Sequence, residues 1–234
     1  MKRDHPDRVH GRQPKRAKPL TGRIEDWLER RELRKSNCTH VDGLWVGDWK
    51  NDRTRQTLPR VEEALRLIKE YDPLQYKCLL RDLERVWVRV LAGPRGQFKY
   101  TLKACELDER FVLAAKTSPE MIASTIVHET THARLRRCGI GYDEKIRARV
   151  EGICFRRQIA FCRKLPNGNE AREQAERSLA YYTAPHWTNA AMVDSDEKGS
   201  VAALRYLGCP EWVIRLILRY RAVLWGIRRT TRRV

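Results

Sequence analysis

The chain has 234 residues and is strongly basic, with 48 lysines and arginines against 30 aspartates and glutamates and a formal net charge of +18. Hydrophobic residues make up 41% of it, including 7 Trp and 8 Tyr, which excludes a protein that is disordered throughout. No window reaches the roughly 18 uncharged apolar residues of a membrane span, and the start has no apolar stretch typical of a signal peptide. We therefore expect an intracellular, cytoplasmic protein whose seven widely spaced cysteines are reduced thiols, mostly in the core.

Much of the positive charge lies at the two ends. Residues 1–20 carry seven basic and two acidic side chains, and residues 215–234 carry seven arginines and no acid. Residues 1–19 have too little apolar surface to offset the entropy of ordering, so we expect a disordered basic tail there and one folded domain over 20–234. Basic ends can bind nucleic acid by neutralising phosphates, and they can equally serve solubility or targeting.

The first part of the expected domain, residues 20–85, is predicted to be mainly helical. Apolar spacing indicates helices over 21–35 and 58–70, the second of which ends before Asp72-Pro73 because proline disfavours helical geometry in the residue before it. The stretch 36–55 has glycines and tryptophans without clean periodicity and is predicted to be a loop with one short strand at most.

The middle part, residues 86–166, begins with a strand pattern. Residues 86–91 and 98–105 alternate in polarity on either side of a Gly-Pro-Arg-Gly turn, which predicts a β-hairpin. A short apolar run at 111–115 predicts a third strand at the edge of that hairpin. The expected fold is therefore α+β, with a small antiparallel sheet packed against a mainly helical body.

The rest of the chain is predicted to be helical, including the C-terminal part, 167–234. Ser118-Pro119-Glu120 is a favourable helix start, because the serine can cap free N–H groups and proline at the first position loses no hydrogen bond. Asp194 and Glu197 fit a capping box. The expected helices cover residues 118–137, 142–164, 170–182, 195–207 and 211–227.

The helix that starts at Ser118 contains His128-Glu129-Thr130-Thr131-His132, an HExxH motif. Two histidines four residues apart lie on one helix face and can both reach a single Zn²⁺. Glu129 then lies beside the metal, where it can take a proton from a zinc-activated water and pass it to a leaving amine. The competing interpretation is an ordinary amphipathic helix with two histidines and no metal.

Zinc requires a third protein ligand, and the next helix offers two glutamates. Glu151 follows His132 by 19 residues, enough for the first helix to end and the second to return antiparallel to it. Glu144 lies closer to the turn, where a carboxylate at a helix N-terminus is explained without a metal. We therefore favour Glu151, with Glu144 as the second choice and Asp143 and Cys138 as the remaining alternatives.

The motif and its surroundings resemble the gluzincins, zinc metallopeptidases with HExxH on one helix and a glutamate ligand on the next. The resemblance covers about residues 86–166 and implies that His128, His132 and Glu151 are metal ligands and Glu129 is the catalytic base. It also implies that the predicted edge strand binds an extended substrate by strand addition. One position departs from thermolysin-like members, which carry an Asp four residues after the ligand Glu, where this chain has Phe155.

Enzymes of this group also use a tyrosine or histidine to stabilise the oxyanion, and spacing does not select one here. The candidates outside the HExxH helix are Tyr142, Tyr181, Tyr182 and His186, and each has an alternative role in packing. Trp187 is predicted either to line a pocket or to pack on the core.

The sequence thus favours a zinc-dependent metallopeptidase that acts on a protein or peptide substrate. A protein of different class also fits the composition: a basic nucleic-acid-binding protein in which the metal site is vestigial or structural. A third interpretation joins the two, a peptidase that acts on proteins bound to nucleic acid.

Overall fold

The computed structural model describes residues 20–49, 56–184 and 188–219, and the chain divides into two compact units, 1–34 and 35–234. The described part of the first unit belongs to helix α1 (Leu20–Lys35), as the pattern over 21–35 predicts. The expected basic tail and the last 15 residues lie outside the described residues, so nucleic-acid contact through the two ends stays a prediction.

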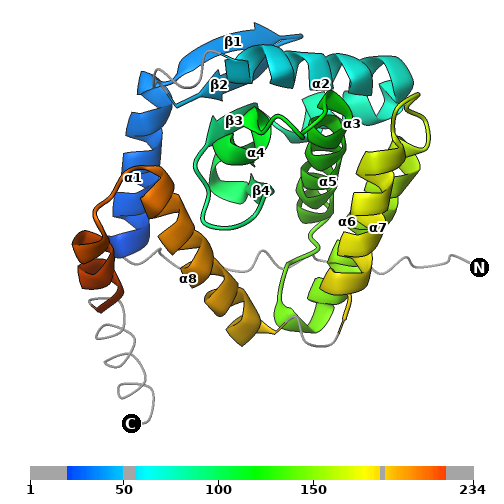
Figure 1. Ribbon diagram of the computed structural model, residues 1–234. Coiled ribbons are helices and arrows are strands. Elements are labelled where there is room, and N and C mark those ends of the chain that lie inside the picture. The colour runs from blue at the N-terminus through cyan, green and yellow to red at the C-terminus, as the bar shows by residue number, and fades with distance from the viewer. Residues whose placement is uncertain (1–19, 50–55, 185–187, 220–234) are drawn as a thin grey trace, which may run out of the picture. The chain divides into compact units, whose positions relative to one another are not determined.

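The second unit is built on a five-stranded mixed sheet in the order β1-β2-β3-β5-β4 (Figure 1). Strands β2, β3 and β5 are parallel to one another, and β1 and β4 are antiparallel to their neighbours. The α+β class is therefore confirmed, whereas the prediction of an antiparallel sheet is wrong. The strands are β1 (Asn37–Val41), β2 (Leu44–Asp48), β3 (Arg85–Arg89), β4 (Gly96–Lys99) and β5 (Ala104–Asp108).

The two alternating runs do not form the predicted hairpin with each other. Val86 of β3 pairs with Cys105 of β5 in parallel, and the other neighbour of Cys105 is Phe98 of the antiparallel strand β4. A single 3₁₀ turn, η2 (Tyr100–Leu102), and Lys103 in the left-handed region at φ 45° break the second run into two strands. The hairpin therefore forms between β4 and β5, and β4 becomes an edge of the sheet.

The segment predicted as a loop forms the hairpin of β1 and β2. Its turn residues, Asp42 and Gly43, have φ values of 49° and 86°, the positive angles that a two-residue type I′ turn requires. Asp-Gly is a strong turn signal, but the flanking strands lack the clean alternation that would have identified them.

The predicted edge strand at 111–115 is also wrong, because this segment forms the short helix α4 (Glu109–Leu113). Phe111 and Val112 are buried, and Glu109 in the first turn accepts a hydrogen bond of 2.8 Å from the Tyr206 hydroxyl. A short apolar run fits a buried helical turn as well as a strand, so periodicity alone could not separate the two.

The other predicted helices are present over the described residues, and the part of the 211–227 helix beyond residue 219 lies outside them. Helix α3 was not predicted from the sequence; it begins after Asp72, whose carboxylate accepts from the Gln75 N–H at 3.2 Å. Helix α8 begins after Thr188, which accepts from Ala191 N–H at 3.3 Å, so a start at residue 195 with an Asp194 cap is wrong. The longer helices are α2 (Thr57–Tyr71), α3 (Pro73–Asp82), α5 (Pro119–Arg137), α6 (Glu144–Cys162), α7 (Asn169–Tyr182) and α8 (Asn189–Tyr206), and residues 211–219 are also helical.

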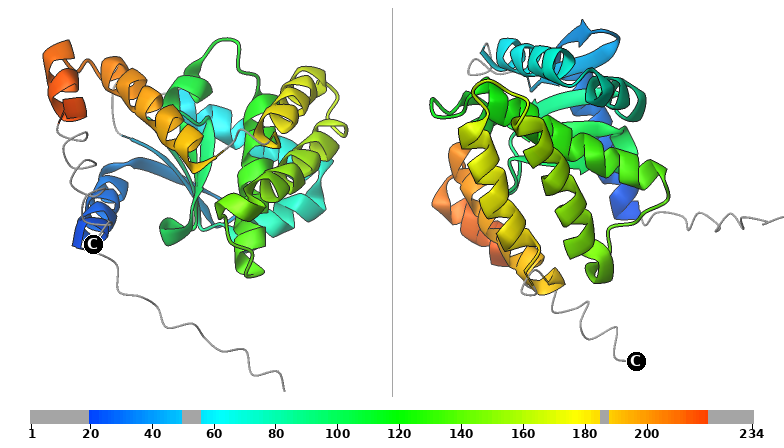
Figure 2. Two further views of the ribbon diagram at one scale, coloured as in Figure 1. Left: turned by 90° about the horizontal axis from the view of Figure 1, so that it is seen from below. Right: turned by 90° about the vertical axis from the view of Figure 1, so that its right-hand side faces the viewer.

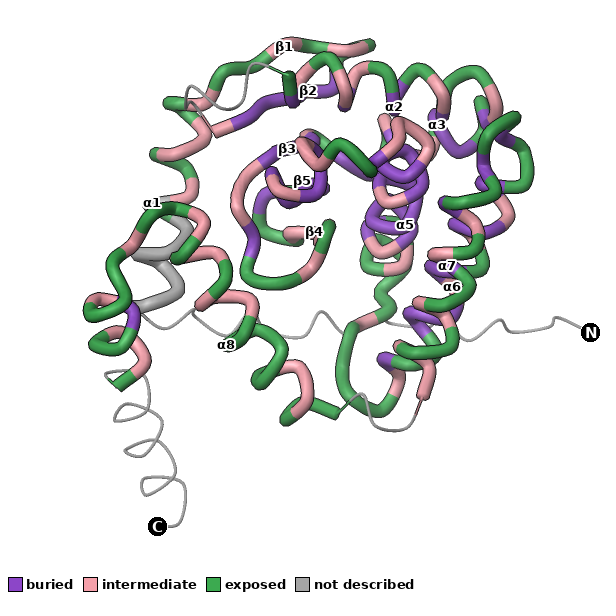
Figure 3. The backbone as a smooth tube through the Cα atoms, in the orientation of Figure 1, coloured by how far each residue is buried: buried purple, intermediate pink, exposed green. Residues whose placement is uncertain are grey.

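The core lies between one face of the sheet and the helices α2, α3 and α5 (Figure 3). Val46, Val86 and Leu107 face Leu65 and Ile126 in this cluster, and all five are fully buried. Each such side chain contributes roughly 1.5–3 kcal/mol through burial. Helices α6 and α7 pack side by side and α6 packs against α5 (Figure 2), so α5 is covered by the sheet on one side and by a helical layer on another.

The cysteines are free thiols, but most of them are not in the core. Cys105, Cys154 and Cys162 are buried, whereas Cys38 and Cys138 are exposed and the other two are partly exposed. Among the described helices, none combines the length and the hydropathy that crossing a membrane would require.

Substitution of two helix-interior glycines by alanine should change the free energy of unfolding in opposite directions. A Cβ at Gly199 of α8 would lie 2.6 Å from backbone atoms of Ala92 and Gly93, whereas a Cβ at Gly152 of α6 would meet the flexible Arg156 guanidinium at 3.3 Å. Gly152→Ala should therefore be neutral or raise the free energy of unfolding by up to about 1 kcal/mol through helix propensity. Gly199→Ala should lower it by about 1–3 kcal/mol, because backbone must move apart. Urea unfolding of both variants measures these two changes. Equal stabilisation by both would show that α8 does not pack closely on the loop that contains Ala92 and Gly93.

Candidate metal centre

Helix α5 carries the HExxH motif through a buried part of the second unit. Ser118 caps it by accepting from the Met121 N–H at 3.3 Å, and the chain leaves it at Gly139, whose φ is 81°. The motif's threonines are buried, and their hydroxyls donate to carbonyl oxygens one turn earlier at 2.7 and 2.8 Å. These bonds satisfy polar groups that would otherwise destabilise a buried helix.

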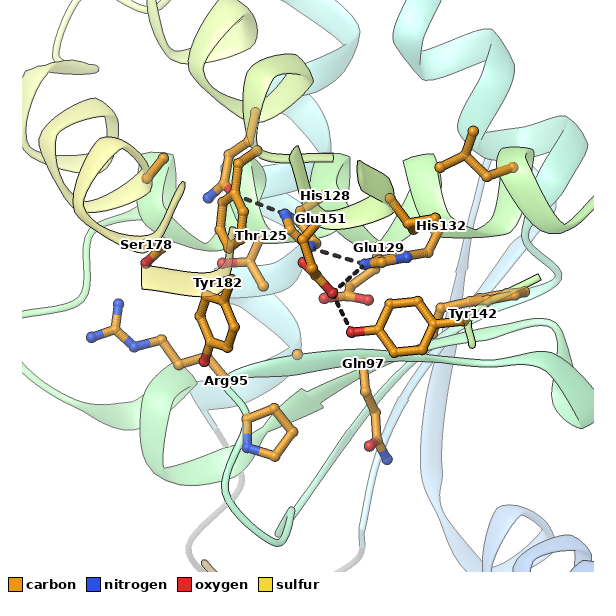
Figure 4. A pocket seen from close by; sticks show the side chains of 18 of the residues that line it. Arg95, Gln97, Thr125, His128, Glu129, His132, Tyr142, Glu151, Ser178 and Tyr182 are labelled. Carbon is orange, nitrogen blue, oxygen red and sulfur yellow. Dashed lines mark hydrogen bonds and ion pairs between the residues drawn. The ribbon is translucent and has the colours of Figure 1, made fainter. Parts of the chain in front are cut away.

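The two histidines and Glu151 come together at the middle of α5 and α6 (Figure 4). The Nε2 atoms of His128 and His132 are 3.1 Å apart. The Glu151 carboxylate lies 3.3 Å from Nε2 of His128 and 3.6 Å from Nε2 of His132. The antiparallel return of α6 thus places this glutamate where the spacing of 19 residues predicts it.

The alternative third ligands occupy other positions. Glu144 accepts hydrogen bonds from the backbone and side-chain nitrogens of Asn189 at 3.1 and 2.7 Å. Asp143 caps α6 by accepting from the Lys145 N–H at 3.1 Å, and Cys138 is exposed at the end of α5. Each therefore has a structural role or position away from the two histidines.

Sequence reasoning missed a second group that could hold a metal ion, formed by His128, His132 and Cys154. One donor atom from each lies within 4.8 Å of the other two, and both His128 and Cys154 are buried. Burial is the main cause that raises the pKa of the Cys154 thiol, and the charges of Glu151 and Glu129 raise it further. Cys154 follows Glu151 by three residues on α6, a helical spacing that could have drawn attention to it.

Gln158 supports His128 from behind. Its Oε1 lies 3.1 Å from Nδ1 of His128, and its Nε2 donates to the Ser124 hydroxyl at 3.1 Å. An amide oxygen at this position accepts a hydrogen bond from Nδ1–H, which leaves the lone pair of Nε2 directed at His132 and Glu151. Gln158 thus supplies the support for a histidine that Phe155 cannot give, while the Phe155 ring packs against His128 at 4.4 Å between centroids. Gln158 is seven residues after Glu151 and hence on the same helix face, a signal that sequence reasoning did not use.

Glu129 is buried where α5 meets the edge strand β4. Burial raises the pKa of Glu129 to about 7, and the charge of Glu151 adds to this effect, while His128 and a hydrogen bond with the Phe98 backbone oppose it. A Cβ at Gly96 of β4 would lie 2.7 Å from Cγ2 of Thr125 and 3.3 Å from Oε1 of Glu129. Glycine therefore permits the strand to approach the motif this closely. The strand edge beside the motif is β4, rather than the segment at 111–115.

The pKa values of the three convergent side chains differ from their ordinary values. Burial acts to raise the pKa of Glu151. A hydrogen bond and the charge of His128, the charge of His132 and a hydrogen bond from Tyr142 outweigh burial and lower this pKa to about 2. Burial and the neighbouring His128 lower the pKa of His132 to about 4. Burial also disfavours the charged form of His128, but Glu151 and Glu129 outweigh burial and hold its pKa above the ordinary value.

Of the four residues considered for stabilising the oxyanion, two line the pocket that contains the motif. Tyr142 donates its hydroxyl to Oε1 of Glu151, and Tyr182 stacks on Phe155 with 5.6 Å between ring centroids. Both line the same pocket as the motif, whereas Tyr181 is 51% exposed and does not line it. His186 and Trp187 lie outside the described residues.

The site opens into a pocket of about 880 Å³ between β4, α5, α6, α7 and α8. His128, Glu129, His132 and Glu151 line it, and Cys154 does not. Gly96, Gln97 and Phe98 of β4 form part of its wall, so the edge of the sheet faces the motif across the pocket. Comparisons with protein-family models, with curated proteins and with solved structures give no significant match, so the site is interpreted from its geometry.

The raised pKa of Glu129 predicts how the stability of the metal-free protein depends on pH. Because the folded state holds the proton with a pKa of about 7 against 4.5 in the unfolded chain, ionisation between these pH values costs stability, up to about 3 kcal/mol. Glu129→Gln stays neutral and avoids this cost. In the presence of a chelator its melting temperature should exceed that of wild type at pH 8, and the difference should shrink toward pH 4.5. A difference that is constant over this range would show that Glu129 is not held neutral by burial.

Proposed function

We propose that this protein is a zinc-dependent metallopeptidase of the gluzincin type, with His128, His132 and Glu151 as metal ligands and Glu129 as general base. The observation that carries the proposal is the convergence of two Nε2 atoms and a carboxylate within 3.6 Å of one another at the wall of a pocket, beside a buried glutamate. Two nitrogens and one oxygen are the donor set of a catalytic zinc site that keeps a position open.

Two of the three donors fit zinc in their protonation states as well as in their positions, whereas His128, with its raised pKa, must lose a proton to bind. Glu151, with a lowered pKa, is ionised, and His132, with a pKa of about 4, is neutral at physiological pH. Gln158 accepts from Nδ1 of His128, which directs the Nε2 lone pair toward the other donors. A metal ion held there would supply Lewis-acid polarisation of the substrate carbonyl and of the attacking water.

Glu151 suits the catalytic role better than Cys154 because the pocket reaches it. Both residues lie on α6 near the two histidines, but only the carboxylate lines the pocket, and it is within 3.6 Å of each Nε2 atom. The thiol is fully buried and its raised pKa disfavours the thiolate that metal binding requires. The set with Cys154 would suit a closed, structural site instead.

The chain's own residues then divide the chemistry of peptide hydrolysis. With a pKa of about 7, Glu129 can accept a proton from the attacking water near neutral pH and deliver it to the leaving amine. Among the described strands none pairs with the outer edge of β4, and this edge runs along the pocket, where an extended peptide can add as a further strand. Tyr142 supplies a hydroxyl to the same pocket for the developing oxyanion.

Metal analysis of variants tests the ligand assignment. His128→Ala and His132→Ala should each lose the zinc after dialysis, and Glu151→Gln should weaken zinc binding by at least about 10- to 100-fold, the range for outer partners of metal ligands. Cys154→Ser and Glu144→Gln are the matched controls and should keep wild-type affinity. Loss of zinc on Cys154→Ser with full retention by Glu151→Gln would assign the metal to the buried set instead.

Hydrolysis by the zinc-loaded protein tests the role of Glu129. Glu129→Gln should keep one zinc per chain and lower peptide hydrolysis by about 100- to 10,000-fold, because it removes the group that moves the proton but no ligand. The measurement is cleavage of a mixed peptide library read by mass spectrometry. Cleavage at an undiminished rate by the variant would refute the assignment of this residue as general base.

A further inference from the structure

The pocket around the proposed active site has more positive than negative charge on its outer wall. Apart from Glu129 and Glu151 at the metal centre, its lining contains three arginines, Arg95, Arg136 and Arg177, against one acid, Asp196. An arginine-lined pocket favours ligands that carry carboxylates, because the guanidinium group offers paired donors that match a carboxylate.

Two of these arginines are already engaged within the protein. Arg177 lies 3.9 Å from Glu173, one turn earlier on α7, and the Arg136 guanidinium lies over the Tyr100 ring at 4.4 Å. Arg136 and Arg95 have no carboxylate partner among the described residues, and each guanidinium lies over an aromatic ring. The Arg95 guanidinium is the farther of the two from its ring, at 5.5 Å from the Phe111 centroid. Partial burial lowers the pKa of Arg95, and the nearby Arg177 lowers it further against an opposing effect of Tyr182.

The position of Arg95 along the chain connects it to the catalytic centre. Arg95 directly precedes Gly96, whose backbone lies against Glu129. The Arg95 side chain therefore starts from the pocket wall next to the general base. Figure 4 shows Arg95, Ser178 and Tyr182 together on the α7 side of the motif, away from Tyr142. The two hydroxyls add donors to the guanidinium, and all three residues line the pocket.

We propose that Arg95, with the hydroxyls of Ser178 and Tyr182, forms a subsite that binds a carboxylate of the peptide substrate on the α7 side of Glu129. This inference rests on the proposed function and specifies its substrate class: extended peptides that place an acidic side chain or a free C-terminal carboxylate next to the cleaved bond. A carboxylate there would pair with a cation that has no other acidic partner among the described residues.

A binding experiment tests the subsite without requiring cleavage. Zinc-loaded Glu129→Gln protein is titrated with fluorescein-labelled alanine octapeptides in which one Glu is moved along the sequence, each compared with its Gln counterpart by fluorescence anisotropy. Each peptide is made with a free and with an amidated C-terminus, so that side-chain and terminal carboxylates are distinguished. The same peptides are then tested for cleavage by protein with an intact Glu129.

We expect one carboxylate position to strengthen binding by about tenfold over its neutral counterpart, the size typical of a hydrogen bond to a charged group. Adding Arg95→Gln should remove this preference, and Arg95→Glu should reverse it in favour of a Lys-substituted peptide. Arg134→Gln is the matched control, since it removes the same charge from an exposed position of α5 that does not line the pocket.

The outcomes separate the subsite from the enzyme. Two results would overturn the subsite. One is a peptide affinity that is the same for Glu and Gln at every position and for free and amidated C-termini. The other is an equal loss of affinity with Arg95→Gln and Arg134→Gln. Carboxylate-dependent binding that Arg95→Gln abolishes supports the subsite even where no peptide is cleaved, and that result would count against the proposed hydrolysis alone.

Discussion

The close approach of β4 to α5 at Gly96 is the contact on which the arrangement of the site depends. With no side chain at this residue, the strand lies against Thr125 and Glu129, and the Phe98 backbone forms a hydrogen bond with the Glu129 carboxylate. That contact excludes water from one side of Glu129, sets its distance from the strand edge and leaves the opposite side of the motif free for α6. The burial that shifts the pKa of Glu129 and the strand edge that faces it thus have a single structural cause.

Two glutamates lie in one small buried region and differ in charge because their neighbours differ. Glu151 is surrounded by two imidazoles and the Tyr142 hydroxyl, so it stays ionised. Glu129 has Glu151 as a neighbour, and the charge of His128 and one backbone hydrogen bond do not outweigh its burial. A pair of carboxylates whose environments move their pKa values apart is a common basis for dividing ligand and acid–base roles. Gln158 and Ser124 extend the network behind His128 without adding another charge.

The sequence predicted what depends on local pattern. The helix start at Ser118 and the HExxH motif identified α5, and the distance to Glu151 reflects a helix–turn–helix return that residue spacing alone describes. Strand pairing depended on distant contacts: whether Val86 faces Cys105 or Phe98 is decided by the 3₁₀ turn before Lys103, which leaves no periodic signal. Arg95 could not be recognised for a similar reason, since its relation to Ser178 and Tyr182 arises only when α7 packs beside the motif.

Strand β4 ends the sheet inside a pocket, and this has a consequence for self-association. Exposed sheet edges are templates for pairing between copies of a chain, and natural proteins protect them with bulges, charges or covering elements. Here the helices α7 and α8 line the same pocket as the edge, so they are covering elements of this kind. The enclosure therefore protects the edge of β4 from pairing with the sheet of a second copy.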